Sequence, residues 1–231
     1  RVGFSTINDN SSNNNTDATN FVALSDFGNA QKSTWYNRLY AINPNGGTPL
    51  IPALDRAGRY YKTGTMPGAS TTARSTTVPL ACTPNYTILS TDGYWNGSAS
   101  ASVGNTDQTV PTLPANVYRD ADTGAAINDP VAGVPLVAGQ RFPAPFYGGT
   151  STSNTLADVA MNYWISDLTA PTSSAGKVAS NPSDPATWQH MVTFTIGLGA
   201  SGTLSTPPTG TSAWPTPQAD SATAIDDLWH A

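Results

Sequence analysis

Two oxygen-bearing side chains, those of Thr48 and Asp92, stand where they could bind a metal ion. Thr48 precedes Pro49 and an amphipathic run with Leu50 and Leu54 on one face, which predicts a helix with Thr48 as its N-cap. Asp92 follows the apolar run NYTILST, which predicts a strand. A hard divalent cation such as Mg²⁺ accepts hydroxyl and carboxylate oxygens and keeps several waters.

Both residues also have simpler structural interpretations. Thr48 can serve as an N-cap alone, and Asp92 can be an ordinary turn residue before Gly93. Residue types alone favour these structural roles. The metal-site hypothesis requires the two side chains to share the edge of one sheet, beyond the carboxyl ends of its strands, where α/β proteins bind ligands.

Strands that alternate with helices along the chain predict an α/β fold. A second helix, within TLADVAMNYWISDL, is predicted to start with a capping box made by Thr155 and Asp158. Near the end of the chain, Asp226 and Asp227 are expected at the positive N-terminal pole of a last helix. The remaining expected elements are strands within residues 1–8, 85–91 and 190–199 and a short helix within residues 33–42.

Residues 97–154 are rich in Gly, Pro, Ser and Thr and contain short β-like runs such as ANVYRDADTG and VPLVAGQRF. We expect them to form an insertion that decorates one core, so that residues 1–231 make a single domain. Because the chain opens directly on a strand-like run, we also expect it to be a piece cut from a longer protein.

Three further motifs are interpreted as structural. The glycines of GLGASG, residues 197–202, have dinucleotide-binding spacing, but the prolines that follow exclude the helix that such a site needs. His190 and His230 are expected to be satisfied structural histidines. The run with Asp120, Asp122 and Gly124 is expected to be a turn rather than a calcium loop, since the chain contains no Glu.

Composition excludes several classes of function. A net charge of -5 and a pI near 4.6 argue against a nucleic-acid-binding surface. No apolar run approaches the roughly 18 residues of a membrane span. Charged residues make up only 11%, and a surface of Ser, Thr, Asn and Gly suits a secreted protein. The single cysteine, Cys82, is expected to be a buried free thiol or to pair outside the chain.

An enzymatic role is not expected. No Ser or Cys nucleophile has a paired base in view, and no Glu is present to act as one.

Four motifs, GGTPL, TDGYWNG, LADVAMNYW and TWQHMVTFTIGLG, occur in this order along the chain. With them the chain resembles the N-terminal von Willebrand A-like domain of the PilY/PilC family, the tip-associated adhesins and biogenesis factors of bacterial type IV pili. The resemblance runs from Arg1 to Ala231, with the Ser/Thr-rich inserts unmatched. It implies a doubly wound α/β sheet with helices on both faces.

The resemblance also implies a metal-ion-dependent adhesion site, built from a DxSxS loop, a Thr and an Asp. Thr48 would be the middle element and Asp92 the last, with Mg²⁺, or alternatively Mn²⁺ or Ca²⁺, as the ion. The DxSxS element is absent from this sequence. Either it was lost with the residues before Arg1, which we expect, or this member of the family has an incomplete site. Tyr94 and Trp95 either hold the insertion against the rim of the site or line its binding face.

By resemblance we expect a non-enzymatic extracellular domain for adhesion and pilus biogenesis, at the pilus tip or the outer cell surface. Its expected partners are minor pilins or the pilus tip complex, and a receptor on a host or abiotic surface. The alternative from a different class is a structural module that assembles or caps the pilus without a metal.

Overall fold

The computed structural model describes most of the chain and every predicted core element. The described residues are 1–8, 18–43, 46–68, 83–97, 101–109, 139–142, 144–168, 178–179, 181, 184, 186 and 188–231. In chain order the elements are β1 (Val2–Ser5), η1 (Ala18–Asn20), β2 (Phe21–Ser25), α1 (Asn29–Tyr40), α2 (Leu50–Thr63), β3 (Asn85–Thr91), α3 (Leu156–Ile165), β4 (Met191–Gly197) and α4 (Thr223–His230).

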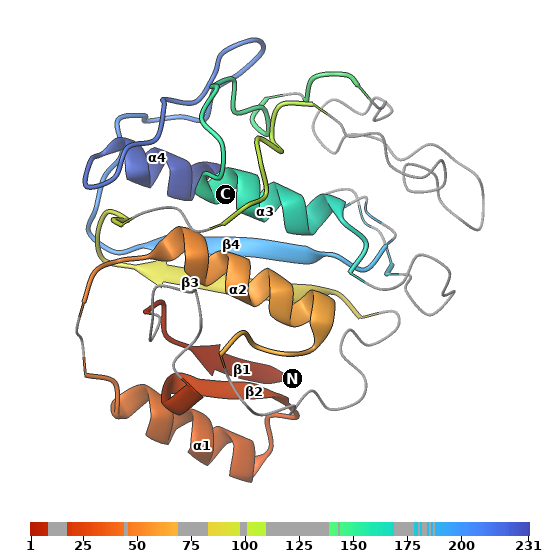
Figure 1. Cartoon of the computed structure of the whole chain (residues 1–231), viewed down its shortest axis with the longest axis vertical. Helices are drawn as coiled ribbons and strands as arrows, with labels where there is room; N and C mark the ends of the chain where they lie inside the picture. The colour runs from red at the N-terminus through yellow and green to blue at the C-terminus, as the bar shows by residue number, and fades with distance from the viewer. Residues whose placement is uncertain are drawn as a thin grey trace.

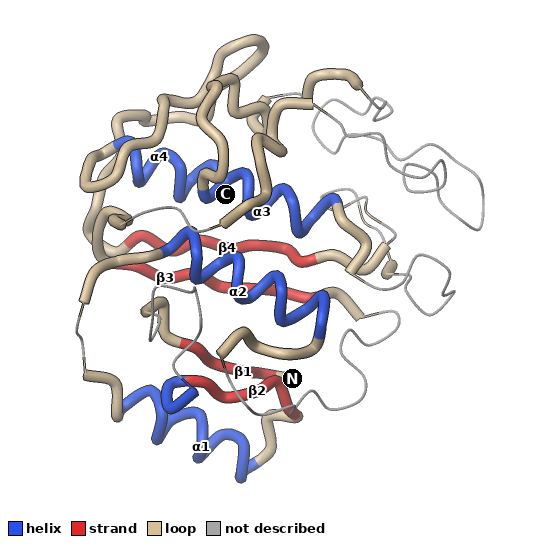
Figure 2. The backbone as a smooth tube through the Cα atoms, viewed as in Figure 1, coloured by secondary structure: helices blue, strands red, loops and turns tan. Residues whose placement is uncertain are grey.

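The described strands form two small sheets (Figure 1). β3 and β4 are parallel, in register from Asn85 opposite Met191 to Thr91 opposite Gly197. β1 and β2 are antiparallel, with an irregularity near Gly3. Helices α2, α3 and α4 contact β3 and β4, whereas α1 contacts β1 and β2 (Figure 2).

The main core lies between β3–β4 and the three helices that pack on it. Leu54, Leu156, Val159 and Met191 are completely buried there. Helices α2 and α3 approach closely at Gly58, where an added Cβ would lie 2.2 Å from the Tyr163 ring. This crossing brings together residues separated by about a hundred positions in the chain.

The two ends of α2 are capped in different ways. Its C-terminus has Gly64 in the left-handed conformation, with φ of 74°, which glycine adopts without steric cost. At the N-terminus the predicted Thr48 cap is wrong, because Pro49 occupies the cap position and no side chain caps the helix. The Thr48 carbonyl instead accepts a hydrogen bond from the Leu50 amide at 2.9 Å.

The helix α3 begins as predicted. The Thr155 hydroxyl accepts from the Asp158 amide, and the Asp158 carboxylate accepts from the Thr155 amide, which completes the capping box. The predicted helices, the first strand, β3 and β4 are all confirmed to within a few residues. β2, whose sequence is FVALS, was not predicted.

The mixed α/β class is confirmed, while the single doubly wound sheet with helices on both faces stays a prediction. The described residues 198–222 form no helix, so the GLGASG glycines lead into a loop, as expected. Cys82 and the run with Asp120, Asp122 and Gly124 lie outside the described residues. So does most of the predicted β-like insertion, and the single-domain prediction remains untested.

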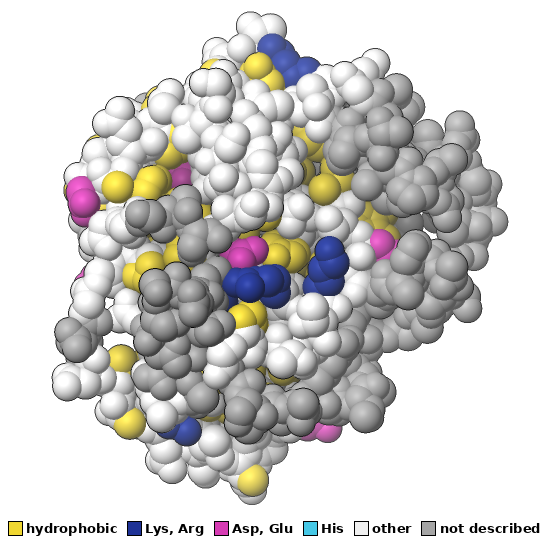
Figure 3. All heavy atoms as spheres, in the orientation of Figure 1, with side chains coloured by type: hydrophobic (Ala, Val, Ile, Leu, Met, Phe, Trp, Pro, Cys, Tyr) yellow, Lys and Arg dark blue, Asp and Glu magenta, His cyan; other side chains and the backbone are white. Residues whose placement is uncertain are grey.

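The described surface carries few charged side chains. In Figure 3 most of the visible described atoms belong to uncharged side chains and backbone, with a few Lys, Arg and Asp side chains among them. This agrees with the 11% charged content of the sequence. Among the described residues, no helix has the length and apolar character needed to cross a membrane.

Candidate functional site

The loops that carry Thr48 and Asp92 are bonded to each other at the carboxyl end of β3 (Figure 1). The Thr48 amide donates to the Asn96 side-chain oxygen at 2.7 Å, and the Asn96 amide donates to the Thr48 carbonyl at 3.1 Å. Gly47 permits this approach, since a Cβ there would lie 2.3 Å from the same Asn96 oxygen. The structure therefore places the Thr48 and Asp92 loops together at one edge.

The four predicted site residues differ in exposure. Asp92 is exposed, and Tyr94 is 38% exposed. Trp95 is buried and belongs to the main core, together with Ala101 from the predicted insertion. This packing favours the interpretation of Trp95 as the residue that holds the insertion against the core, and it leaves Tyr94 as the accessible aromatic.

The described residues at this edge supply only some of the ligands that a divalent cation needs. Mg²⁺ requires six oxygen ligands in near-octahedral geometry. Asp92 offers a carboxylate and Thr48 a hydroxyl, but the described part of the chain holds no group of three or more His, Cys, Asp or Glu side chains able to bind a metal. The remaining oxygen ligands would have to come from water or from residues other than the described ones.

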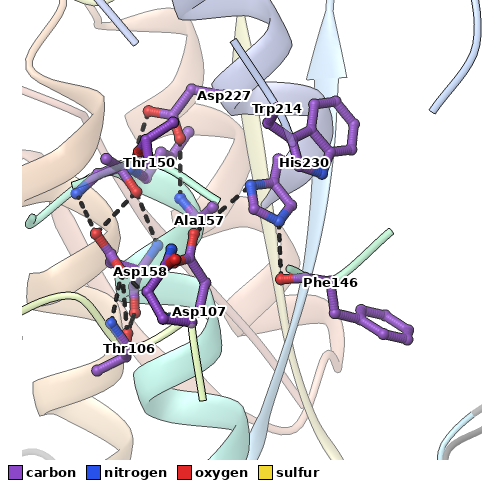
Figure 4. A network of polar contacts seen from close by, with 12 residues as sticks. Thr106, Asp107, Phe146, Thr150, Ala157, Asp158, Trp214, Asp227 and His230 are labelled. Carbon is purple, nitrogen blue, oxygen red and sulfur yellow. Dashed lines mark hydrogen bonds and ion pairs between the residues drawn. The ribbon is translucent and has the colours of Figure 1, made fainter. Parts of the chain in front are cut away.

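A second group of acids, which sequence analysis missed as a unit, is buried at the N-terminus of α3 (Figure 4). It comprises Asp107, Asp158 and Asp227, each at most 5% exposed. Besides capping α3, Asp158 accepts from the Thr106 amide at 2.6 Å and from the Asp107 amide at 3.3 Å. Asp158 thereby fixes the loop of residues 101–109 to the start of the helix.

Asp227 was predicted to lie at the N-terminal pole of its own helix, but its carboxylate bonds to a different helix. Its two carboxylate oxygens accept from the amides of Leu156 at 3.0 Å and Ala157 at 3.1 Å, at the start of α3. These are amide groups that a helix leaves without intrahelical partners, at the positive end of its dipole. Asp227 thus joins α4 to α3. Its neighbour Asp226 accepts from the Thr203 and Leu204 amides, which ties α4 to the loop after β4.

Burial shifts the pKa values of Asp107, Asp227 and the neighbouring His230. Burial, with repulsion from Asp158, raises the pKa of Asp107 to about 7, and burial raises the pKa of Asp227 to about 7 despite its two amide donors. Burial lowers the pKa of His230 to about 4. The neutral His230 ring donates from Nε2 to the Phe146 carbonyl at 3.0 Å and stacks on Trp214.

The other ring nitrogen of His230 faces Asp107. Nδ1 lies 3.8 Å from the Asp107 Oδ2 atom, too far for a direct hydrogen bond. A cavity of about 10 Å³, lined by Asp107, Thr155, Asp227 and His230 among others, adjoins them. That volume suits one water molecule rather than a substrate. We interpret the group as a structural joint between α3, α4 and the 101–109 loop.

His190 is confirmed as a satisfied structural histidine. Its Nδ1 contacts the Trp188 carbonyl at 2.7 Å, and its Nε2 contacts Asp184 at 2.9 Å. His230 is confirmed in the same way by its contacts with Phe146 and Trp214. Two sequence signals pointed to single members of the buried group: the capping box identified Asp158, and the expected start of the last helix identified Asp227.

Comparison with curated proteins gives three matches, each covering 90% of this chain. Those in Pseudomonas aeruginosa strains PAO1 and PAK are 33% identical to it, and that in strain UCBPP-PA14 is 35% identical; all are named type IV pilus biogenesis factor PilY1. This chain belongs to the PilY family. It spans 18% of the length of these PilY relatives. No family model and no solved structure matches it.

Proposed function

We propose that this PilY-family chain is a non-enzymatic extracellular domain that acts in type IV pilus biogenesis and adhesion. The observation that carries the proposal is the similarity to PilY1 proteins over 90% of the chain. The proposed location is the pilus tip or the outer cell surface. The proposed partners are minor pilins or other components of the pilus tip, and a receptor on a host or abiotic surface.

Within this role, we propose cation-dependent binding at the edge formed by the Thr48 and Asp92 loops. The exposed Asp92 carboxylate would supply a charged ligand and Thr48 a neutral one, and residues other than the described ones would complete the set. Mg²⁺, or alternatively Mn²⁺ or Ca²⁺, would offer an open coordination position to an acidic group. Tyr94, exposed beside Asp92, would contact the bound partner.

A second candidate is a structural module that assembles or caps the pilus without a metal. Two observations favour it: among the described residues no cluster could hold a metal by itself, and Trp95 packs into the core instead of facing the edge. In this case the domain would contribute shape and contact surface to the pilus tip, and Asp92 would be a turn residue.

The two candidates differ in what a double substitution does in a piliated strain. We expect Thr48→Ala with Asp92→Ala, in the full-length protein, to leave the number of surface pili unchanged and to reduce Mg²⁺-dependent adhesion. Pili are counted by electron microscopy, and adhering cells are counted with and without a chelator. Asp26→Ala is the matched control, because the Asp26 side chain is 88% exposed and pairs with Arg1 rather than with the Thr48 or Asp92 loop.

Lost piliation in the double variant would favour the structural module. Unchanged piliation with unchanged adhesion would contradict the cation-dependent role.

A further inference from the structure

Helix α1 and the turn before it present a row of aromatic rings at the surface. Phe27 is 40% exposed, Tyr36 is 37% exposed and Tyr40 is 79% exposed. The Trp35 ring lies between them, 6.2 Å from the Phe27 ring and 5.1 Å from the Tyr36 ring. The Tyr36 and Tyr40 rings stack on each other at 5.9 Å, with their planes 22° apart. We call these four residues the aromatic row.

The aromatic row is fixed to the sheet beneath it. The Trp35 indole donates to the Gly3 carbonyl at 3.1 Å, and its ring contacts the Phe4 ring edge to face. Among the described elements, α1 makes its main contacts with β1 and β2, and it lies at one end of the molecule (Figure 1). A row of rings that is already in place offers a large contact area at little cost in conformational entropy.

Hydrogen-bonding side chains border the two stacked tyrosines. Residues three or four positions apart lie on the same face of a helix. Ser33 therefore lies beside Tyr36, and Asn37 lies between Ser33 and Tyr40 along the same face. Both Ser33 and Asn37 are exposed. This face thus combines aromatic rings with a hydroxyl and an amide that can each bind a polar ligand.

The helix is also locally positive, although the whole chain has a net charge of -5. It contains Lys32 and Arg38 and no acidic residue. Asp26, just before it, pairs with Arg1 at 3.0 Å, and among the described residues no acid pairs with Lys32. Lys32 is exposed and lies one turn before Tyr36 on the same face. The charge of this surface is complementary to an anionic ligand.

We propose that the aromatic row binds an acidic polysaccharide, with a sugar ring on the exposed Tyr40 and a sugar carboxylate at Lys32. The C–H groups on the face of a pyranose are weakly positive and fit the negative face of an aromatic ring. The carboxylate forms a charge-assisted pair with the ammonium group. Lys32 and Tyr40 are eight residues apart, about 12 Å along the helix. A chain of several sugars spans that length, whereas a single sugar does not.

A lipid membrane fits this helix less well. A helix that lies in a membrane interface turns a face of Leu, Phe or Trp side chains outward. In α1, Trp35 and Leu39 are only partly exposed, and the Trp35 indole is bonded to β1. The exposed face carries Ser33 and Asn37 instead.

This inference does not rest on the proposed function. The aromatic row needs no metal ion, so its binding of polysaccharide should persist in a chelator and in the Asp92→Ala variant. It would give the protein a second binding surface on a different element from the Asp92 edge.

Binding of the full-length protein to immobilised polysaccharides tests the inference. Polygalacturonate and hyaluronate are the carboxylated probes and dextran is the neutral one, and interferometry is carried out in EDTA. We expect the wild type to bind both carboxylated probes more tightly than dextran. The double variant Tyr36→Ala with Tyr40→Ala should bind them roughly tenfold more weakly, because both rings are lost.

Single variants separate the contribution of the ring from that of the charge. Tyr40→Phe should keep the wild-type affinity, because it keeps the ring. Lys32→Gln should weaken binding and reduce its dependence on salt. Lys62→Gln is the matched control, because Lys62 is exposed but lies on α2. Melting curves show whether each variant is folded.

Failure of the wild type to bind either carboxylated probe would overturn the inference, and so would unchanged affinity of the folded double tyrosine variant. Tighter binding to phosphatidylglycerol vesicles than to the polysaccharides, lost in that variant, would overturn it in favour of a membrane. Loss of polysaccharide binding in EDTA or in Asp92→Ala would also overturn it, because the contact would then belong to the Asp92 edge. Failure of the cation site itself is measured separately, by Mg²⁺ titration.

Discussion

The part of the molecule built on β3–β4 and the part built on β1–β2 are stabilised in different ways. Three helices bury β3–β4 on one face, and their contact residues form the main core. The β1–β2 pair is covered by α1, which has no buried residue at all. The first part depends on a large apolar core, whereas the second depends on a small apolar cluster around Tyr60 and Met66 and on a few polar contacts.

Those polar contacts come from α1 and from α2. The side chains of Gln31 and Trp35 donate to backbone carbonyls of β1, at 2.9 and 3.1 Å. From α2, the buried Arg56 donates to the Ile7 carbonyl at 2.6 Å and Tyr60 accepts from the Leu24 amide. A hydrogen bond typically adds about 1 kcal/mol net, so a few of them hold a small unit only weakly. The comparison indicates that β1–β2 opens before the main core does.

The largest expected effect comes from a cavity in the main core. Leu54→Ala should lower the free energy of unfolding by about 2–5 kcal/mol, because Leu54 is completely buried. The matched variant Leu39→Ala, on α1, should cost less than about 1 kcal/mol, because Leu39 is only partly buried. Urea denaturation of both variants measures the difference. Equal losses in the free energy of unfolding would contradict the distinction between the two parts.

Local patterns in the sequence predicted the main-core elements well. The strand predicted from the apolar run NYTILST and the capping box at Thr155 and Asp158 both depend on nearby residues, and both were confirmed. The Thr48 cap was wrong by one residue, because Pro49 can also take the cap position. β2 is only five residues long, and its strand character depends on pairing with β1, which no local pattern reveals.

The candidate site was less predictable, because it depends on contacts between distant segments. The sequence predicted that the loops of Thr48 and Asp92 share one edge of the sheet, but it did not predict the hydrogen bond between Thr48 and Asn96. Asp227 was assigned to its own helix, but it bonds to the start of α3, seventy-one residues away from Leu156. Acidic side chains are generally stabilised near helix N-termini, but the sequence does not tell which helix N-terminus a given carboxylate contacts.

A second prediction concerns pH, and it separates the buried acids from exposed ones. The folded pKa of Asp107, about 7, lies above its unfolded value of 3.8, so its contribution to stability is complete below 3.8 and is lost as pH rises through about 7. The raised pKa of Asp227 changes stability with pH in the same direction. The pKa of His230 is lowered to about 4, so its contribution has the opposite sign and is lost as pH falls from 6.5 through 4.

With two acids against one histidine, stability should fall as pH rises from about 4 to about 8, by an amount of the order of 5 kcal/mol. Asp107→Asn should flatten this slope, because the amide does not ionise, whereas exposed Asp92→Asn should keep it. Urea unfolding across that pH range measures both. A wild-type slope that persists in Asp107→Asn would show that Asp107 does not control it.

The smallest expected effect sharpens the account of the β1–β2 part. Tyr60→Phe removes the hydroxyl that accepts from the Leu24 amide and should cost about 1 kcal/mol. Amide exchange of β2 should accelerate, while exchange of β3 and β4 stays as in the wild type. Acceleration in all four strands would mean that the two parts open together.

The most direct test of the central claim is a Mg²⁺ titration of the full-length protein by calorimetry. We expect the wild type to bind the ion and Asp92→Ala to bind it at least tenfold more weakly, with the affinity of Asp26→Ala unchanged. Melting curves in the absence of metal confirm that both variants are folded, which the exposure of both carboxylates leads us to expect. Equal Mg²⁺ affinity of Asp92→Ala and the wild type would contradict the claim that this edge binds a cation.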